Sequence, residues 1–204
     1  MGVNELAEQA AAAARNGATV IQYRDKTGTG RQMVDRGRTI RAALLGTGVP
    51  LLINDRADVA LAIGANGVHL GREDMHPEDA RRLLGETAII GLTVKNAADA
   101  DFAAMASIDY ACVGGVFTTI SKHNPEPPVG LNGFAELAMH IKRSKPDMPV
   151  GAIAGIDFET APEVIKAGAD GVAVISAIFR AGDPAAATRR MRSIIDQALE
   201  ERAR

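Results

Sequence analysis

The chain reads Leu51-Leu-Ile-Asn54-Asp55-Arg56, continues through an alanine-rich helical stretch, and then reads Gly67-Val-His69-Leu-Gly71-Arg-Glu-Asp74-Met. This pattern predicts two consecutive strand-to-helix units, each with an acidic residue in the loop after its strand. Asp55 and Asp74 are nineteen positions apart. In a parallel sheet they would fall at the same ends of adjacent strands, about 4.8 Å apart. Two carboxylates placed there suit Mg²⁺, which completes its octahedron with water and phosphate oxygens.

The alternation of strand and helix patterns extends along the whole chain. The expected strands are residues 18–24, 50–53, 67–70, 88–92, 110–114, 149–153 and 171–175, and a helical pattern follows each one. The phrases Gly64-Ala-Asn-Gly67 and Gly168-Ala-Asp-Gly171 mark repeated joints between a helix and the next strand. Repeated right-handed units of this kind predict an α/β fold, the (β/α)₈ TIM barrel, with its active site at the C-terminal ends of the strands. We expect residues 1–204 to form a single catalytic domain.

The number of strands is one short of eight. The chain opens on a helical pattern over residues 4–16, followed by about seven strands and seven more helices. The first strand of the barrel is therefore apparently missing from this chain, which would leave two unpaired strand edges. Three explanations stay open: a natural start upstream, closure by another segment or chain, or a miscounted strand.

Composition narrows the class of protein. The chain has 204 residues, 47% of them hydrophobic, and a formal net charge of −2. A slightly acidic balance gives no general affinity for nucleic acid or membrane surfaces. The single Cys112 excludes an internal disulfide and fits a reducing compartment. Because no apolar run approaches about 18 residues and no secretory leader pattern is present, we expect a soluble cytoplasmic protein.

Cationic residues follow the first expected strand. Gln22, Arg24 and Lys26 share one parity, so they project from one face if the strand persists. One interpretation is a strand end whose charges simply reach solvent. The other is a site for a diphosphate with Mg²⁺, because two cations would then lie beside Asp55 and Asp74, with Arg24 gripping oxygens in a bidentate manner and Lys26 acting as a point charge.

A second polar cluster follows the strand at 110–114. It reads Gly114-Gly-Val-Phe-Thr118-Thr119-Ile-Ser121-Lys122-His-Asn124, and such a loop of glycines, hydroxyls and a lysine is by itself weak evidence for a site. The last two strands end in Ala154-Gly155 and Ile175-Ser176, where this fold frequently binds a phosphate. The mouth of the barrel is thus predicted to hold two anion sites.

Five ordered motifs carry a family resemblance over nearly the whole chain. They are Gln22-Tyr-Arg24-Asp-Lys26, Asn54-Asp55-Arg56, the stretch from Gly67 to Asp74, the stretch from Asp109 to Lys122, and Gly168-Ala-Asp-Gly-Val-Ala-Val-Ile175-Ser176. Together they resemble the thiamine phosphate synthase family. The resemblance implies a Mg²⁺-dependent transferase that joins hydroxymethylpyrimidine diphosphate to a thiazole phosphate, releases diphosphate and forms thiamine phosphate. These two small molecules are the implied partners, and a homo-oligomer is a further possibility.

The resemblance also implies residue roles. The positions implied to bind the diphosphate are Gln22, Arg24, Lys26, Asn54 and Lys122, and those implied to hold Mg²⁺ are Asp55 and Asp74. Those implied to surround the thiazole phosphate are Thr119, Ser121, Gly155, Ile175 and Ser176. Lys122 and Thr93 are implied to act near the reacting groups.

Some positions depart from the family pattern. Ala154 replaces a glycine, so its methyl group is expected to crowd the backbone beside the thiazole phosphate loop. Asp25 replaces a glutamate, and Gly115 and Thr118 stand where prolines are common. His69 is interpreted as a structural hydrogen-bonding residue, since no second His or Cys lies at ligand spacing.

Two other functions are weighed against the transferase. A thiazole tautomerase of the same fold would carry a proton-shuttling histidine near position 95, which is Lys95 here, and would lack the full diphosphate set. A non-catalytic protein that binds thiamine precursors is the third interpretation. The intact Arg24, Lys26, Asp55 and Asp74 argue against such a loss of turnover.

Overall fold

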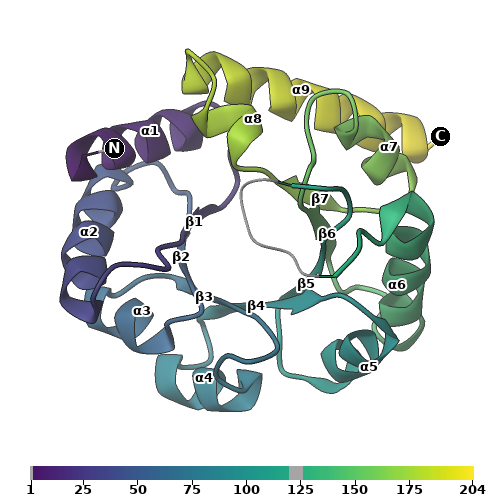
Figure 1. Ribbon diagram of the computed structural model, residues 1–204, viewed down its shortest axis with the longest axis horizontal. Coiled ribbons are helices and arrows are strands. Elements are labelled where there is room, and N and C mark those ends of the chain that lie inside the picture. Colours follow the sequence, from purple (N-terminus) through teal and green to yellow (C-terminus); the bar gives the residue numbers. More distant parts are fainter. Residues whose placement is uncertain (1, 120–125) are drawn as a thin grey trace.

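The computed structural model describes residues 2–119 and 126–204. Seven strands form one parallel sheet in sequence order: β1 (Ile21–Tyr23), β2 (Leu51–Asn54), β3 (Gly67–Leu70), β4 (Ile89–Val94), β5 (Tyr110–Gly114), β6 (Val150–Ile153) and β7 (Gly171–Ala173). The sheet curves around a centre, and the helices lie outside it (Figure 1). Each strand pairs with the next from β1 to β7, and within the described ranges no ladder joins β7 to β1. The predicted TIM-barrel-like fold with seven strands is confirmed, as an open barrel.

The helices alternate with the strands. They are α1 (Val3–Arg15), α2 (Gly30–Ala43), α3 (Ala57–Ile63), α4 (Pro77–Leu84), α5 (Ala97–Met105), α6 (Gly130–Ser144), α7 (Ala161–Lys166), α8 (Ser176–Phe179) and α9 (Pro184–Arg202). The described residues thus hold one helix more than predicted, because a single turn, α8, forms separately before α9. Local signals set the starts of several helices: Thr29 forms a capping box on α2, and Asn96 and Asp183 cap α5 and α9. Among the described helices, none has the length and apolar character needed to cross a membrane.

Side chains on the strands separate into two sets. Residues in register share a side of the sheet, because successive side chains on a strand alternate. Val68 and Ile90 are in register, fully buried, and belong to the apolar core between sheet and helices. The opposite side faces the centre of the ring. Asn54, His69, Gly91 and Tyr110 are consecutive register partners on that side, across β2 to β5.

The same hydrogen-bonding arrangement recurs three times at the N-terminal edge of the sheet. Asn66, Asp109 and Asp170 each lie directly before a strand, and their side-chain oxygens accept the N–H near the start of the preceding strand at 2.9, 2.7 and 2.8 Å. Their own backbone N–H groups donate back to the carbonyl of the same partner. These paired bonds satisfy backbone groups at the strand starts and hold neighbouring strands in register.

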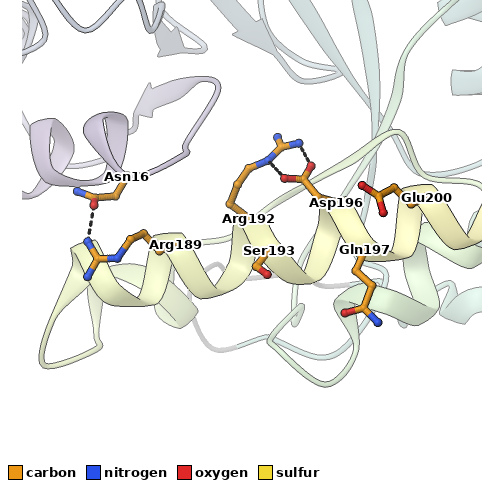
Figure 2. A pocket seen from close by; sticks show the side chains of 7 residues that line it. All are labelled: Asn16, Arg189, Arg192, Ser193, Asp196, Gln197 and Glu200. Atoms are coloured by element: carbon orange, nitrogen blue, oxygen red, sulfur yellow. Dashed lines mark hydrogen bonds and ion pairs between the residues drawn. The ribbon is translucent and has the colours of Figure 1, made fainter.

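The two ends of the described chain meet on the outside of the ring. Helices α1 and α9 pack side by side. Figure 2 shows Arg189 of α9 donating to the side chain of Asn16, the residue that ends α1. Arg192 and Asp196 of α9 form an ion pair beside it, in a polar groove of about 470 Å³. The helix layer therefore continues across the position where the strand ladder is open.

Candidate functional site

Asp55 stands at a sharp turn after β2. Its φ of 66° lies in the left-handed region, which aspartate tolerates better than most residues. The backbone N–H of Asp55 donates to the carbonyl of His69 at 2.8 Å, and the N–H of Arg56 donates to the carbonyl of Asn54 at 2.8 Å. The turn therefore ties the end of β2 to the neighbouring β3 and fixes the direction of the Asp55 side chain.

Asp74 meets Asp55 from the loop after β3. Its carboxylate accepts the N–H of Gly71 at 2.7 Å, and the two carboxyl groups lie close enough to shift each other's pKa. Burial raises the pKa of Asp74, and the interaction with the neighbouring Asp55 raises it further. Burial also acts to raise the pKa of Asp55, but the interactions with Lys26 and Asp74 outweigh it and hold that pKa below its ordinary value. The structure thus brings together the two acids that the sequence singled out.

Cations reach the same place from the loop after β1. Lys26 forms an ion pair with Asp55 through its Nζ atom, and Arg24 lies near enough to lower the pKa of Asp55 electrostatically. The strand ends at Tyr23, so Arg24 and Lys26 project from a loop instead of from a continued strand. Gln22 remains within the strand, and Asn54 is buried on the interior side of β2.

Asp25 holds this cationic loop in place. Its carboxylate accepts the N–H groups of Thr27 and Gly28 at 3.0 and 2.8 Å, and it pairs with Arg36 of α2 at 2.6 Å. The hydrogen bond from the Thr27 N–H, together with those from Gly28, Tyr23 and Arg36, outweighs burial and lowers the pKa of Asp25 to about 2. Asp25 is therefore an anchor for the loop that carries Arg24 and Lys26.

The donor set fits a hard divalent cation with an open coordination sphere. Two carboxylates converge, and the described residues contain no group of three or more His, Cys, Asp and Glu side chains that could hold a metal ion. Mg²⁺ commonly takes one or two carboxylates and fills its other positions with water and substrate phosphate oxygens. Asp55 and Asp74 are the residues that would hold such an ion.

A second part of the mouth lies beyond β5 and β6. The loop after β5 packs on the turn after β6, because a Cβ atom on Gly155 would lie only 2.5 Å from the Thr118 carbonyl oxygen. The N–H of Phe117 donates to the carbonyl of Ala154 at 3.0 Å. Thr119, half-buried, follows directly in this loop. Ser121 and Lys122, which the sequence also singled out, lie outside the described residues.

Ala154 adopts a φ of 91°. Side chains with a Cβ atom rarely take such a value, so the backbone of Ala154 is strained. Ile175 and Ser176 are exposed at the end of β7, where Ser176 begins the short helix α8. Gly155 and Ser176 therefore follow neighbouring strands, which agrees with the predicted grouping of these positions.

Sequence reasoning missed one polar connection inside the ring. His69 accepts or donates hydrogen bonds at 2.8 Å on both ring nitrogens, to Tyr110 on one side and to Thr93 on the other. The hydrogen-bonding role predicted for His69 agrees with this, but Tyr110 was not recognised. The available signal was parity, since His69, Thr93 and Tyr110 all occupy interior-facing positions on three consecutive strands.

Comparisons with known proteins agree with this geometry. A family model described as thiamine monophosphate synthase matches residues 2–178. A thiamine-phosphate synthase of Agrobacterium fabrum is 64% identical over 98% of this chain and 91% of its own length, and one of a Roseiflexus species is 45% identical over 100% of this chain and 84% of its own.

Comparison with solved structures supports the same family. A thiamine phosphate pyrophosphorylase from Pyrococcus furiosus superposes with a TM-score of 0.82 at 37% identity, covering 95% of this chain and 90% of that one. A 3-hexulose-6-phosphate synthase superposes with a TM-score of 0.68 at 19% identity over 94% of each chain, which shows the shared fold alone. The chain therefore belongs to the thiamine monophosphate synthase family.

Proposed function

We propose that this protein is a thiamine-phosphate synthase that transfers the hydroxymethylpyrimidine group from its diphosphate to thiazole phosphate, with Mg²⁺ as cofactor. The observation that carries the proposal is the convergence of Asp55, Asp74, Lys26 and Arg24 at one mouth of the ring. This arrangement suits a metal-bound diphosphate, because the two acids can hold Mg²⁺ while the two cations pair with phosphate oxygens. The close identity to thiamine-phosphate synthases supports the same activity.

The reaction needs charge stabilisation more than a protein nucleophile. The bond between the pyrimidine methylene carbon and the diphosphate oxygen breaks, and its electron pair leaves with the diphosphate. The lone pair of the thiazole nitrogen then forms the new carbon–nitrogen bond. Arg24 and Lys26 stabilise the negative charge that grows on the leaving group. Mg²⁺ held by Asp55 and Asp74 would supply Lewis-acid neutralisation of that charge. Holding both substrates in line supplies a further part of the rate.

The remaining site assignments belong to this proposal. Gln22, Asn54 and Lys122 complete the diphosphate site, and Thr93 and Lys122 act next to the reacting groups. The thiazole phosphate site comprises Thr119, Ser121, Gly155, Ile175 and Ser176. The contact between the loop after β5 and Gly155 supports this grouping. Residues 1–204 act as one catalytic domain, and the cytoplasmic location is part of the same proposal.

The test compares two aspartate variants that lie three residues apart. Asp55→Asn keeps a side chain that tolerates positive φ but removes the metal-binding charge. Asp58→Asn removes an exposed carboxylate that pairs with Arg56 at the start of α3. We expect Asp55→Asn to lose at least about 100-fold of kcat/KM for Mg²⁺-dependent thiamine phosphate formation. Asp58→Asn should stay close to the parent protein. Equal rates for the two variants would refute the assigned metal site.

A further inference from the structure

Three side chains form a hydrogen-bonded chain across the interior of the ring. The hydroxyl of Tyr110 on β5 lies 2.8 Å from Nδ1 of His69 on β3, and Nε2 of His69 lies 2.8 Å from Oγ1 of Thr93 on β4. His69 is buried, with 7% of its surface exposed. A buried imidazole bonded on both nitrogens has a fixed ring orientation, and in its neutral form one nitrogen donates a hydrogen bond while the other accepts one.

Two glycines make room for this chain. Gly91 is the register partner of both His69 and Tyr110, and a Cβ atom on it would lie 2.1 Å from Cζ of the Tyr110 ring. A Cβ atom on Gly114 would lie 3.1 Å from Cγ2 of Thr93. The tyrosine ring therefore crosses β4 over bare backbone to reach the histidine, which no other residue type at position 91 would allow.

The direction of the hydrogen bonds follows from the tyrosine. Burial raises the pKa of Tyr110, with the neighbouring Cys112 adding to it, so its hydroxyl keeps its proton. In the part of the chain that the structure describes, the hydrogen-bond partner of that hydroxyl is His69. Buried hydroxyl protons are nearly always donated to an acceptor. Tyr110 therefore donates to Nδ1, which leaves the imidazole proton on Nε2, and the Nε2–H donates to Oγ1 of Thr93.

We propose that Tyr110 and His69 are positioning residues that hold the Thr93 hydroxyl as a hydrogen-bond donor to the bound pyrimidine diphosphate. Thr93 accepts from His69, so its own proton is left for another acceptor. Its side chain is half-buried on the interior side of β4, which leaves it within reach of a ligand bound in the ring. This inference rests on the proposed function for the identity of the ligand. No bond is broken in it, since Tyr110 and His69 only fix a direction.

The tautomer of His69 is measured without turnover. The protein labelled with ¹⁵N-histidine is placed at neutral pH, and the long-range couplings of the ring nitrogens are recorded for the parent chain, Tyr110→Phe and Tyr23→Phe. We expect His69 to carry its proton on Nε2 in the parent and in Tyr23→Phe, and to lose that preference in Tyr110→Phe. Tyr23 is the matched control because it lies on β1 and its hydroxyl bonds to Asp25. A proton on Nδ1 in the parent chain would overturn the proposal.

Kinetics then test whether the tyrosine acts through the threonine. One hydrogen bond to a substrate corresponds to about a threefold to tenfold change. Tyr110→Phe should lower kcat/KM for the pyrimidine diphosphate by that factor and leave KM for thiazole phosphate unchanged. Thr93→Val should lower it at least as much. In the Thr93→Val background, Tyr110→Phe should cost nothing further, and additive losses would contradict the relay.

A conservative variant separates positioning from simple packing. His69→Gln retains an amide N–H that can donate toward Thr93, whereas His69→Leu does not. We expect the glutamine to restore part of the activity that the leucine loses, and equal losses with retained fold by circular dichroism would count against the proposal. If the parent chain forms no thiamine phosphate, the proposed function fails. The NMR measurement of the His69 tautomer is independent of that outcome, because it requires no turnover.

Discussion

At the scale of single residues, the mouth of the ring is defined by charges that hold one another in place. Lys26 pairs with Asp55, and the carboxyl groups of Asp55 and Asp74 lie close enough to shift each other's pKa. The sequence predicted that these residues would converge, because strand ends of a parallel sheet meet at one edge. It did not predict the left-handed backbone of Asp55 or the anchoring role of Asp25, since both depend on contacts between loops.

The anchor residue gives a pH-dependent stability. The folded pKa of Asp25 is about 2, below its ordinary value of 3.8. The stabilisation by the charged form is therefore complete above about pH 4 and is lost as the pH falls toward 2. We expect Asp25→Asn, which keeps an acceptor for the Thr27 N–H, to lower the free energy of unfolding by about 1–2 kcal/mol at pH 7. Urea titrations at pH 7 and pH 3 check this, and a difference that does not shrink at pH 3 would contradict it.

At the scale of elements, changes in side-chain size at two adjacent positions after β6 are expected to have opposite effects on stability. Ala154 has a φ of 91° and Gly155 a φ of 68°. Ala154→Gly removes the strain of a Cβ atom at positive φ, and we expect a gain of up to about 1 kcal/mol in the free energy of unfolding. The melting temperature checks this. A clear loss of stability would show that the alanine methyl group is needed for packing.

Gly155→Ala tests the same turn from the other side. Its Cβ atom would collide with the Thr118 carbonyl oxygen at 2.5 Å, and the backbone would also be strained. We expect a loss of about 2 kcal/mol in stability and a higher KM for thiazole phosphate, with little change in KM for the pyrimidine diphosphate. Initial rates with each substrate varied in turn would check this. An unchanged KM for thiazole phosphate would show that this turn is not part of the thiazole phosphate site.

The hydrogen bonds at the N-terminal ends of the strands are expected to affect the stability of the protein but not its activity. Asn66→Ala removes the acceptor for the first N–H of β2, and we expect a loss of about 1 kcal/mol in the free energy of unfolding. The specific activity of the folded variant should match the parent, because this bond lies at the N-terminal ends of the strands. A loss of activity without a loss of stability would contradict the separation of the two edges.

Element boundaries show where sequence reasoning works. Strands β3 and β5 have the predicted bounds, because glycines or turn residues flank their apolar runs. Strand β1 is shorter than the predicted 18–24, since its ladder partner β2 begins only at Leu51 and pairs with residues 21–23. Strand β4 is longer at its C-terminal end, reaching Val94, because residues through Val94 continue to pair with β5. Pairing with a neighbour therefore decides the ends that propensity leaves open.

At the scale of the whole molecule, the fold separates stability from chemistry. Apolar side chains fill the layer between sheet and helices, while Asn54, His69, Thr93 and Tyr110 occupy the interior of the ring. The strand alternation was legible in the sequence, so the fold and the acidic pair could be predicted. Parity places Tyr110, His69 and Thr93 on the interior side, but their contacts could not be predicted, because they join positions 41 and 24 residues apart and depend on the bare backbone at Gly91.

The open strand ladder does not interrupt the outer layer. Helix α1 packs against α9 next to the position where β7 and β1 are not joined. All of the described charges assigned to the diphosphate lie on β1 to β3 and the loops that follow them, on one side of that opening. The proposed thiazole phosphate residues follow β5 to β7. The two proposed substrates would therefore approach each other across the interior from opposite arcs of the ring.

The most direct measurement of the central claim is a paired product assay on the purified protein. Thiamine phosphate and diphosphate are quantified together after incubation with pyrimidine diphosphate and thiazole phosphate, with and without Mg²⁺. We expect equal molar amounts of the two products, formed only when Mg²⁺ and both substrates are present. A folded protein that forms no thiamine phosphate under these conditions would contradict the account.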